Sequence, residues 1–208
     1  MKALLIIDPQ YDFFEGGALA VPNSLAIIPA INQLIPAFTH IYLTQDWHPA
    51  THKSFATQHP GTQPFETIQL NGITQVLWPS HCVQGSHGAT FHADIQLPEQ
   101  YTVVHKGNDP EVDSYSGFFD NQRLHQTQLH QQLQSAGITT LYICGLATDY
   151  CVKFTALDAQ ELGYHTTLIS DATKAVNMQA HDYTEALATM QKAGIQIAST
   201  TQVLTQID

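Results

Sequence analysis

Positively charged side chains are scarce in this sequence of 208 residues. It contains 7 Lys and Arg residues against 18 Asp and Glu residues, which gives a formal net charge of -11 at pH 7. Proteins that bind nucleic acids or anionic membrane surfaces usually present a basic patch to them. The charge balance therefore argues against nucleic acid and membrane as partners.

Long apolar runs and a paired set of cysteines are also missing. No apolar run approaches the roughly 18 residues of a membrane-spanning helix, and the stretch from Met1 to Asp8 becomes acidic too early for a signal peptide. The cysteines Cys82, Cys144 and Cys151 are odd in number, so a disulfide framework is not expected. These absences predict a cytoplasmic protein. The oligomeric state is left open, with a homo-oligomer among the alternatives.

Strand-like and helix-like segments alternate along the chain. Short apolar runs predict strands over 3–7, 41–44, 101–104, 140–144, 165–169 and 195–198, and apolar residues at helical spacing predict helices over 27–38, 129–136, 152–162 and 181–193. Pro29 is tolerated only in a first helical turn, so the first of these helices should begin late. Residues 46–100 lack strong periodicity, which predicts a functional excursion with only short helices or turns. The alternation predicts one α/β domain over 1–208, a three-layer sandwich around a mainly parallel six-stranded sheet.

The segment Gly145–Val152 joins the fourth predicted strand to a helix and reads Gly-Leu-Ala-Thr-Asp-Tyr-Cys-Val. Thr148 or Asp149 can cap this helix, and Cys151 then falls in its first turn. Unpaired N–H groups and the positive end of the helix dipole favour a thiolate there. The position predicts a nucleophile, and the alternative is one more buried structural cysteine.

Reactive residues follow the first four predicted strands. Asp8 follows the first, Asp46 and His48 the second, Lys106 the third and Cys151 the fourth. The ligand crevice of a parallel sheet lies beyond the carboxyl ends of its strands, so we expect these side chains to meet. Asp8 can take the thiol proton and return it to a leaving amine, while Lys106 can lower the thiol pKa. The backbone N–H groups of Ala147 and Cys151 are candidates for an oxyanion hole.

A carboxylate and an imidazole two residues apart, Asp46 and His48, can bind one divalent ion together. A third ligand would come from the excursion, which offers His52, His59, His81, His87 and His92. The spacing alone leaves the choice open, and a chance match is a real alternative in a chain with 12 His residues. Zn²⁺, Fe²⁺ and Mn²⁺ all accept such ligands.

Six segments together resemble the nicotinamidase (pyrazinamidase) family of isochorismatase-like cysteine hydrolases. They are Asp8-x-Gln10-x-Asp12-Phe13 with Gly16-Gly17-x-Leu19, Gln45-Asp46-Trp47-His48-Pro49, Trp78-Pro79-x-His81-Cys82-Val83, His105-Lys106-Gly107, Asp113-Ser114-Tyr115-Ser116, and Gly145 to Val152. The resemblance spans the whole chain in order and spacing. It implies hydrolysis of nicotinamide to nicotinate and ammonia in NAD salvage, and of pyrazinamide to pyrazinoate.

Carried over by matching position, the resemblance implies roles for individual residues. The catalytic triad would be Asp8, Lys106 and Cys151, with a thioester formed on Cys151. One divalent metal ion, zinc first among the candidates, would be bound by Asp46, His48 and His81. Phe13 and Trp78 would stack on the pyridine ring with Tyr115 nearby, and the peptide bond between Leu146 and Ala147 would be cis. The spacing of His52 does not favour a fourth ligand, so water is expected in the remaining positions.

Two other functions fit parts of the sequence. A sister isochorismatase-like hydrolase that acts on another amide or a carbamate predicts a metal-free site, so metal analysis of the purified protein separates it from a nicotinamidase. A non-enzymatic redox or metal sensor built on the three cysteines would leave Asp8 and Lys106 without a role.

Overall fold

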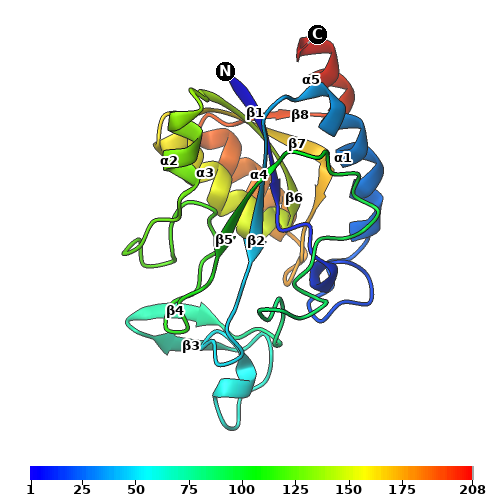
Figure 1. The fold of residues 1–208 in the computed structure, drawn as a ribbon. Coiled ribbons are helices and arrows are strands. Elements are labelled where there is room, and N and C mark those ends of the chain that lie inside the picture. Colours follow the sequence, from blue (N-terminus) through cyan, green and yellow to red (C-terminus); the bar gives the residue numbers. More distant parts are fainter. Residues whose placement is uncertain (208) are drawn as a thin grey trace.

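The computed structural model describes residues 1–207, with a six-stranded sheet at its centre (Figure 1). The strands are β1 Lys2–Ile7, β2 Ile41–Asp46, β5 Thr102–Lys106, β6 Thr140–Leu146, β7 His165–Lys174 and β8 Gln196–Ala198. Neighbouring strands are all parallel, in the order β5-β2-β1-β6-β7-β8. The six predicted strands are confirmed, although β7 extends well beyond its predicted end.

Helices cover both faces of the sheet and give three layers. Figure 1 shows α1 (Ile28–Leu34) and α5 (Thr200–Ile207) on one side, with α2 (Leu129–Ser135), α3 (Lys153–Glu161) and α4 (Asp182–Lys192) on the other. Successive strand residues point to opposite faces. Ile6 of β1 therefore packs into the core cluster that contains α1 and α5 residues, whereas Leu5 packs into the one that contains α2, α3 and α4 residues. The predicted α/β sandwich is confirmed.

The first and last helices differ from the prediction. α1 carries Pro29 in its first turn, as expected, but ends at Leu34. A 3-10 turn with Pro36 follows, because proline has no N–H group to continue the helix. α5 was missed altogether. Its sequence is Thr-Thr-Gln-Val-Leu-Thr-Gln-Ile, in which β-branched and polar residues obscure the helical spacing.

The excursion contains more regular structure than the sequence suggested. Strands β3 (Thr67–Leu70) and β4 (Ile73–Val76) form an antiparallel hairpin separate from the main sheet. Its turn is Asn71-Gly72, with positive φ at both residues, and Asn-Gly is the strongest short-range hairpin signal. The expectation of only short helices or turns is therefore wrong at this point.

Gly145 lets β6 approach the end of β1 closely. Its φ is 108°, and a Cβ atom there would lie 2.2 Å from the carbonyl oxygen of Ile7. Only glycine fits both conditions. The turn after β6, which carries Cys151, is thereby brought beside Asp8, the residue that follows β1.

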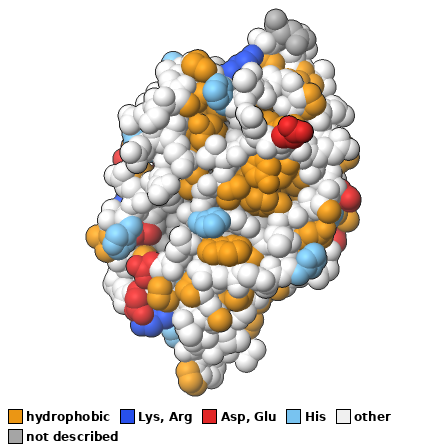
Figure 2. All heavy atoms as spheres, viewed as in Figure 1, with side chains coloured by type: hydrophobic (Ala, Val, Ile, Leu, Met, Phe, Trp, Pro, Cys, Tyr) orange, Lys and Arg blue, Asp and Glu red, His pale blue; other side chains and the backbone are white. Residues whose placement is uncertain are grey.

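The face of the molecule in Figure 2 shows few charged side chains among uncharged polar and hydrophobic ones. This agrees with a composition in which only 12% of residues are charged. Among the helices of residues 1–207, none has the length and apolar character that crossing a membrane requires.

Candidate active site

Lys106, the last residue of β5, brings Asp8 and Cys151 together. Its Nζ atom lies 2.9 Å from Asp8 Oδ2 and 3.4 Å from Cys151 Sγ. The same atom donates hydrogen bonds to Asp46 Oδ1 and, at 2.9 Å, to the carbonyl oxygen of Ser114. The Lys106 and Asp8 side chains have no solvent exposure. Three residues predicted from strand ends thus form one buried cluster.

Asp8 is oriented by Thr44 of β2. The Thr44 hydroxyl donates to Asp8 Oδ1 at 2.7 Å, and the Asp8 N–H group donates to Thr44 Oγ1 at 3.1 Å. Asp8 Oδ2 faces the Lys106 ammonium group at 2.9 Å and accepts no other hydrogen bond in residues 1–207, so it keeps a lone pair for a proton. Burial raises the pKa of Asp8, and Lys106 offsets only part of the rise. A raised carboxyl pKa suits a group that both takes and returns a proton near neutral pH.

Cys151 lies in a π-type turn, Thr148–Val152, that precedes α3. The Val152 N–H group donates to the carbonyl oxygen of Ala147, five residues earlier, at 3.0 Å. Such single π-turns are frequent at functional sites. The peptide bond between Leu146 and Ala147 is cis, as the resemblance implied.

The expected cap of the following helix is wrong. Neither Thr148 nor Asp149 makes a side-chain hydrogen bond to the start of the helix. Thr148 bonds instead to the hydroxyl of Thr173 at 2.8 Å. The Asp149 carboxylate accepts hydrogen bonds from the segment after β7. Both side chains therefore reach across to β7 and its continuation.

The expected resting thiolate at Cys151 is not supported either. Burial raises the pKa of this thiol well above its usual range, and Lys106 counteracts that rise only in part. Asp8 and Asp46 raise the pKa further because their negative charges oppose a thiolate. The arrangement therefore favours a neutral thiol at Cys151, with the Asp8 carboxylate close to it.

Asp46, His48 and His81 form a candidate metal centre next to this cluster. Asp46 Oδ2 lies 3.6 Å from His48 Nε2 and 3.8 Å from His81 Nε2, and all three residues are buried. Backbone carbonyl oxygens fix both rings: that of Gly107 is 3.0 Å from His48 Nδ1, and that of Pro79 is 2.8 Å from His81 Nδ1. With Nδ1 engaged, each imidazole turns Nε2 toward the carboxylate. This donor set fits a divalent metal ion.

Asp46 keeps its negative charge in this buried place. Burial alone would raise its pKa, but Lys106 and His48 hold the pKa well below the usual range of a carboxyl group. Gln10 fixes the Asp46 backbone, because its amide donates to the Asp46 carbonyl oxygen at 2.7 Å and accepts the Asp46 N–H at 2.8 Å. The carboxylate is thus charged and positioned before any ion binds.

A second group of potential ligands adjoins the first. The ligand atoms of His48, His52 and Asp113 lie within 4.8 Å of one another. Within the described chain, His52 Nε2 has no hydrogen-bond partner. His48 has only one free ring nitrogen, since Nδ1 bonds to Gly107, so it cannot serve two ions at once. His52 therefore lies beside the candidate metal ligands, although its sequence spacing from His48 did not favour it as a ligand. Nothing in the sequence indicated that Asp113 could be a ligand.

A small pocket of about 30 Å³ is bordered by Cys151 and by two residues of the metal group, Asp46 and His81. The predicted ring-binding residues Phe13, Trp78 and Tyr115 all line it, together with Leu19, Asp113, Ala147, Tyr150 and Val176. Trp78 Nε1 donates to the Tyr115 hydroxyl at 3.3 Å. Walls of this kind suit a flat ring. The sequence motifs contain Leu19 and Tyr150, whose roles were missed, whereas Val176 lies outside every motif.

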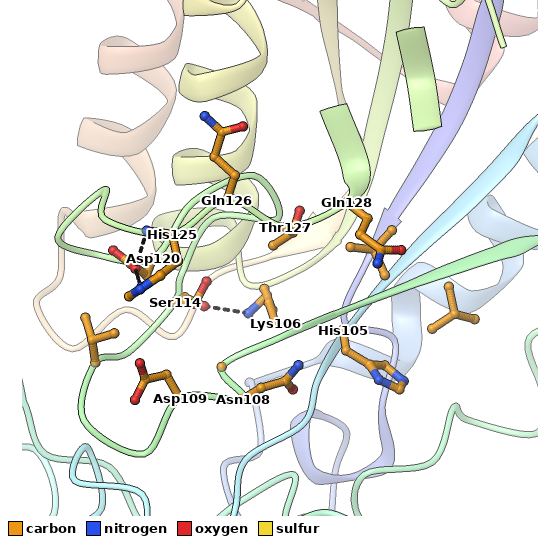
Figure 3. A pocket seen from close by; sticks show the side chains of 14 residues that line it. His105, Lys106, Asn108, Asp109, Ser114, Asp120, His125, Gln126, Thr127 and Gln128 are labelled. Carbon is orange, nitrogen blue, oxygen red and sulfur yellow. Dashed lines mark hydrogen bonds and ion pairs between the residues drawn. The ribbon is translucent and has the colours of Figure 1, made fainter. Parts of the chain in front are cut away.

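A wider hollow of about 410 Å³ lies beside β5 (Figure 3). Its lining is mostly polar and includes Asn108, Asp109, Asp120 and His125. Figure 3 shows Lys106 at this hollow, joined to Ser114 by a hydrogen bond. Of the predicted site residues only Lys106 borders it. The smaller pocket is therefore the candidate active site, because Cys151, Asp46 and His81 line it.

Comparisons with known proteins agree with this geometry. The isochorismatase domain family matches residues 2–202. Nicotinamidase of Escherichia coli (strain K12) is 47% identical over 197 residues, covering 93% of this chain and 92% of that protein. Among solved structures, the Acinetobacter baumanii nicotinamidase/pyrazinamidase has a TM-score of 0.94 at 45% identity and covers 97% of both chains. Pyrococcus horikoshii pyrazinamidase in complex with zinc has a TM-score of 0.79 at 37% identity and covers 95% of this chain and 98% of its own. The chain belongs to the isochorismatase family and, within it, to the nicotinamidases.

Proposed function

We propose that this chain hydrolyses nicotinamide to nicotinate and ammonia, with Cys151 as the nucleophile. The observation that carries the proposal is the position of the Cys151, Lys106 and Asp8 cluster at a pocket that also reaches the metal group. The near full-length similarity to nicotinamidases supports the same substrate. Pyrazinamide carries the same carboxamide on a flat nitrogen ring, so we expect it to be a second substrate.

The aromatic walls would hold the pyridine ring. Phe13 and Trp78 are buried and line the pocket, so either can stack on a ring inserted between them. Tyr115 is tied to Trp78 through its hydroxyl group and would steady the indole from the side. Binding in this way directs the carboxamide toward Cys151.

Asp46, His48 and His81 would hold one divalent ion at the pocket. When bound, this ion would supply a Lewis-acid contact for the ring nitrogen, directly or through water. We propose zinc because the Pyrococcus pyrazinamidase was solved with zinc. Fe²⁺ and Mn²⁺ accept the same ligands.

The first half of the reaction would form a thioester. Asp8 Oδ2 takes the proton from the Cys151 thiol while the sulfur attacks the carboxamide carbon. The backbone N–H groups of Ala147 and Cys151 stabilise the oxyanion. When the C–N bond breaks, Asp8 returns the proton to the departing nitrogen, and ammonia leaves. Lys106 stays protonated and offsets the negative charge near the sulfur.

The second half would release the acid. A water molecule gives a proton to Asp8 and attacks the thioester carbon, so that a second oxyanion forms at the same N–H groups. The C–S bond then breaks, the sulfur regains a proton from Asp8, and the nicotinic acid that is formed leaves and loses its carboxyl proton to water as nicotinate. The enzyme returns to its starting state with one amide bond hydrolysed.

The alternatives from the sequence find less support. A sister hydrolase of another amide or a carbamate would need no metal, whereas here Asp46, His48 and His81 lie together, and Asp46 and His81 line the pocket. For a redox sensor, Cys82 and Cys144 are poor candidates. Both are buried, and burial raises their thiol pKa values, which lowers thiolate reactivity.

The cytoplasmic location and the role in NAD salvage are proposals. They are consistent with three free cysteines and with nicotinamide as the substrate. A homo-oligomer stays among the alternatives for the assembly.

The test is ammonia release from nicotinamide, measured together with metal content. We expect ammonia and nicotinate to form in equal amounts, a chelator to slow the reaction, and added Zn²⁺ to restore it. Absence of ammonia release would contradict the proposed function. Full activity of metal-depleted protein toward nicotinamide would contradict the metal part alone.

A further inference from the structure

Asp149, two residues before the nucleophile, is a buried carboxylate with both oxygens engaged by one distant segment. Its Oδ1 accepts the N–H group of Val176 at 2.9 Å, and its Oδ2 accepts that of Asn177 at 2.8 Å. Hydrogen bonds to a charged acceptor are about twice as strong as neutral ones. Asp149 therefore connects the turn that carries Cys151 to the chain that follows β7.

That segment supplies one wall of the pocket. The Val176 side chain lines the pocket and packs against the core cluster of α1. β7 ends at Lys174, so the hydrogen bonds of the sheet do not reach Val176. Neighbouring contacts hold the rest of the segment: the Tyr150 hydroxyl lies 3.0 Å from Met178 Sδ, and Asn177 Oδ1 accepts the N–H group of Tyr183 at 3.0 Å. The backbone of Val176 itself is held by Asp149.

The small size of the pocket makes the position of this wall important. The pocket is narrow, and Leu19, Phe13 and Trp78 are among its other apolar walls. Because Val176 lines the pocket, a methyl group on the side of a bound ring that faces Val176 would contact this side chain. Displacement of Val176 would therefore change which rings can enter.

We propose that Asp149 is a positioning residue that holds Val176 in the pocket wall and so limits the ring substituents that the site accepts. The inference rests on the proposed function, since it concerns the selectivity of that same pocket. Asp149 acts through Val176 and contacts no reacting atom. The substrates it discriminates against are nicotinamides with an additional alkyl group on the pyridine ring.

The main variant is Asp149→Asn, which keeps one acceptor oxygen and turns an NH₂ group toward the second N–H donor. We expect the KM for nicotinamide to rise while kcat stays within about twofold, as for a loss of binding alone. The substrate ratio is the kcat/KM for a ring-methylated nicotinamide divided by the kcat/KM for nicotinamide. This ratio should rise about tenfold, which is the usual discrimination from one methyl group in an apolar pocket. Val176→Ala should raise the same ratio, and the double variant should add little, because both changes remove the same wall.

The matched control is Asp120→Asn. Asp120 is also a buried carboxylate that accepts backbone N–H groups, from Gln122, Leu124 and His125, but it does not line the small pocket. This variant should lose stability without a change in the substrate ratio. An equal change in both variants would show a general effect of destabilisation and overturn the proposal.

Hydrogen–deuterium exchange provides a measurement that needs no substrate. The Val176 and Asn177 amides should exchange faster in Asp149→Asn than in the wild type. If the wild type hydrolyses no ring amide, the proposed function fails while this exchange result still holds. If it hydrolyses nicotinamide but folded Asp149→Asn keeps the wild-type substrate ratio, the inference fails alone. Asp149→Ala serves where Asn does not fold, and failure of both variants to fold would overturn the positioning role.

Discussion

The side-chain nitrogen of Lys106 lies 3.4 Å from the sulfur of Cys151. Burial alone would lower the lysine pKa, but the carboxylates of Asp46 and Asp8 raise it well above its usual range, so the ammonium group stays charged. One buried cation therefore connects the proposed nucleophile, the proton acceptor and a metal ligand. Changes at this cation should affect both chemistry and stability.

Lys106→Met should shift the alkylation of Cys151 to higher pH, because Lys106 lowers the pKa of that thiol. It should also destabilise the protein by about 3–5 kcal/mol, the usual result of removing one partner from a buried ion pair. The measurements are the alkylation rate as a function of pH and the melting temperature. The control is Lys53→Met, which removes a partly exposed lysine paired with Glu111. An unchanged alkylation profile in Lys106→Met would assign control of the thiol pKa to the backbone of the turn.

His81→Ala should remove bound metal and most of the activity while the metal-free protein melts almost normally. His81 is oriented by a backbone carbonyl and faces Asp46, so its loss removes a ligand and little of the core. Metal content, melting temperature and nicotinamide hydrolysis are measured on the same preparation. If this variant keeps full metal occupancy, another histidine is the third ligand, with His52 first among the candidates.

Gly107→Ala tests whether the close contact between Gly107 and the His48 ring positions this ring for metal binding. A Cβ atom at Gly107 would lie 2.4 Å from His48 Cε1, so the ring has to move. We expect weaker metal binding, measured by titration of the metal-free protein. Gly163→Ala is the matched control, because Gly163 also has a positive φ but its Cβ would meet nothing within 4 Å. Both variants should lose about 1 kcal/mol to backbone strain. Equal metal affinity in the two would contradict the role of the Gly107 contact.

Asp120 should contribute to stability above pH 4. Burial alone would raise its pKa, but hydrogen bonds from Leu124, His125 and Gln122 hold it below the ordinary value of 3.8. The folded protein thus binds this proton less tightly than the unfolded chain, and the stabilisation is lost as the pH falls through the folded pKa. On acidification below about pH 4 the wild type should lose melting temperature more steeply than Asp120→Asn. Parallel curves would show that Asp120 makes no such contribution.

The sequence could predict the site residues at strand ends. Apolar runs indicate where the strands end, and the carboxyl ends of parallel strands lie at one edge of the sheet. Asp8 and Lys106 are such cases. The hydrogen bond between Asp149 and Val176 could not be predicted. Val176 is 27 residues from Asp149 and donates through its backbone N–H group, which does not depend on the type of side chain. The raised pKa of Cys151 depends on burial and on the carboxylates around it, which only the fold defines. The β3–β4 hairpin, in contrast, carried a readable signal in Asn71-Gly72.

The central claim is that Cys151 forms a thioester with the substrate. The most direct test is acid quenching of the protein during nicotinamide turnover, followed by mass spectrometry of the peptide that contains Cys151. The proposed mechanism predicts a nicotinoyl group on that cysteine, its absence from Cys82 and Cys144, and no hydrolysis by Cys151→Ala. Appreciable turnover by Cys151→Ala would contradict the claim.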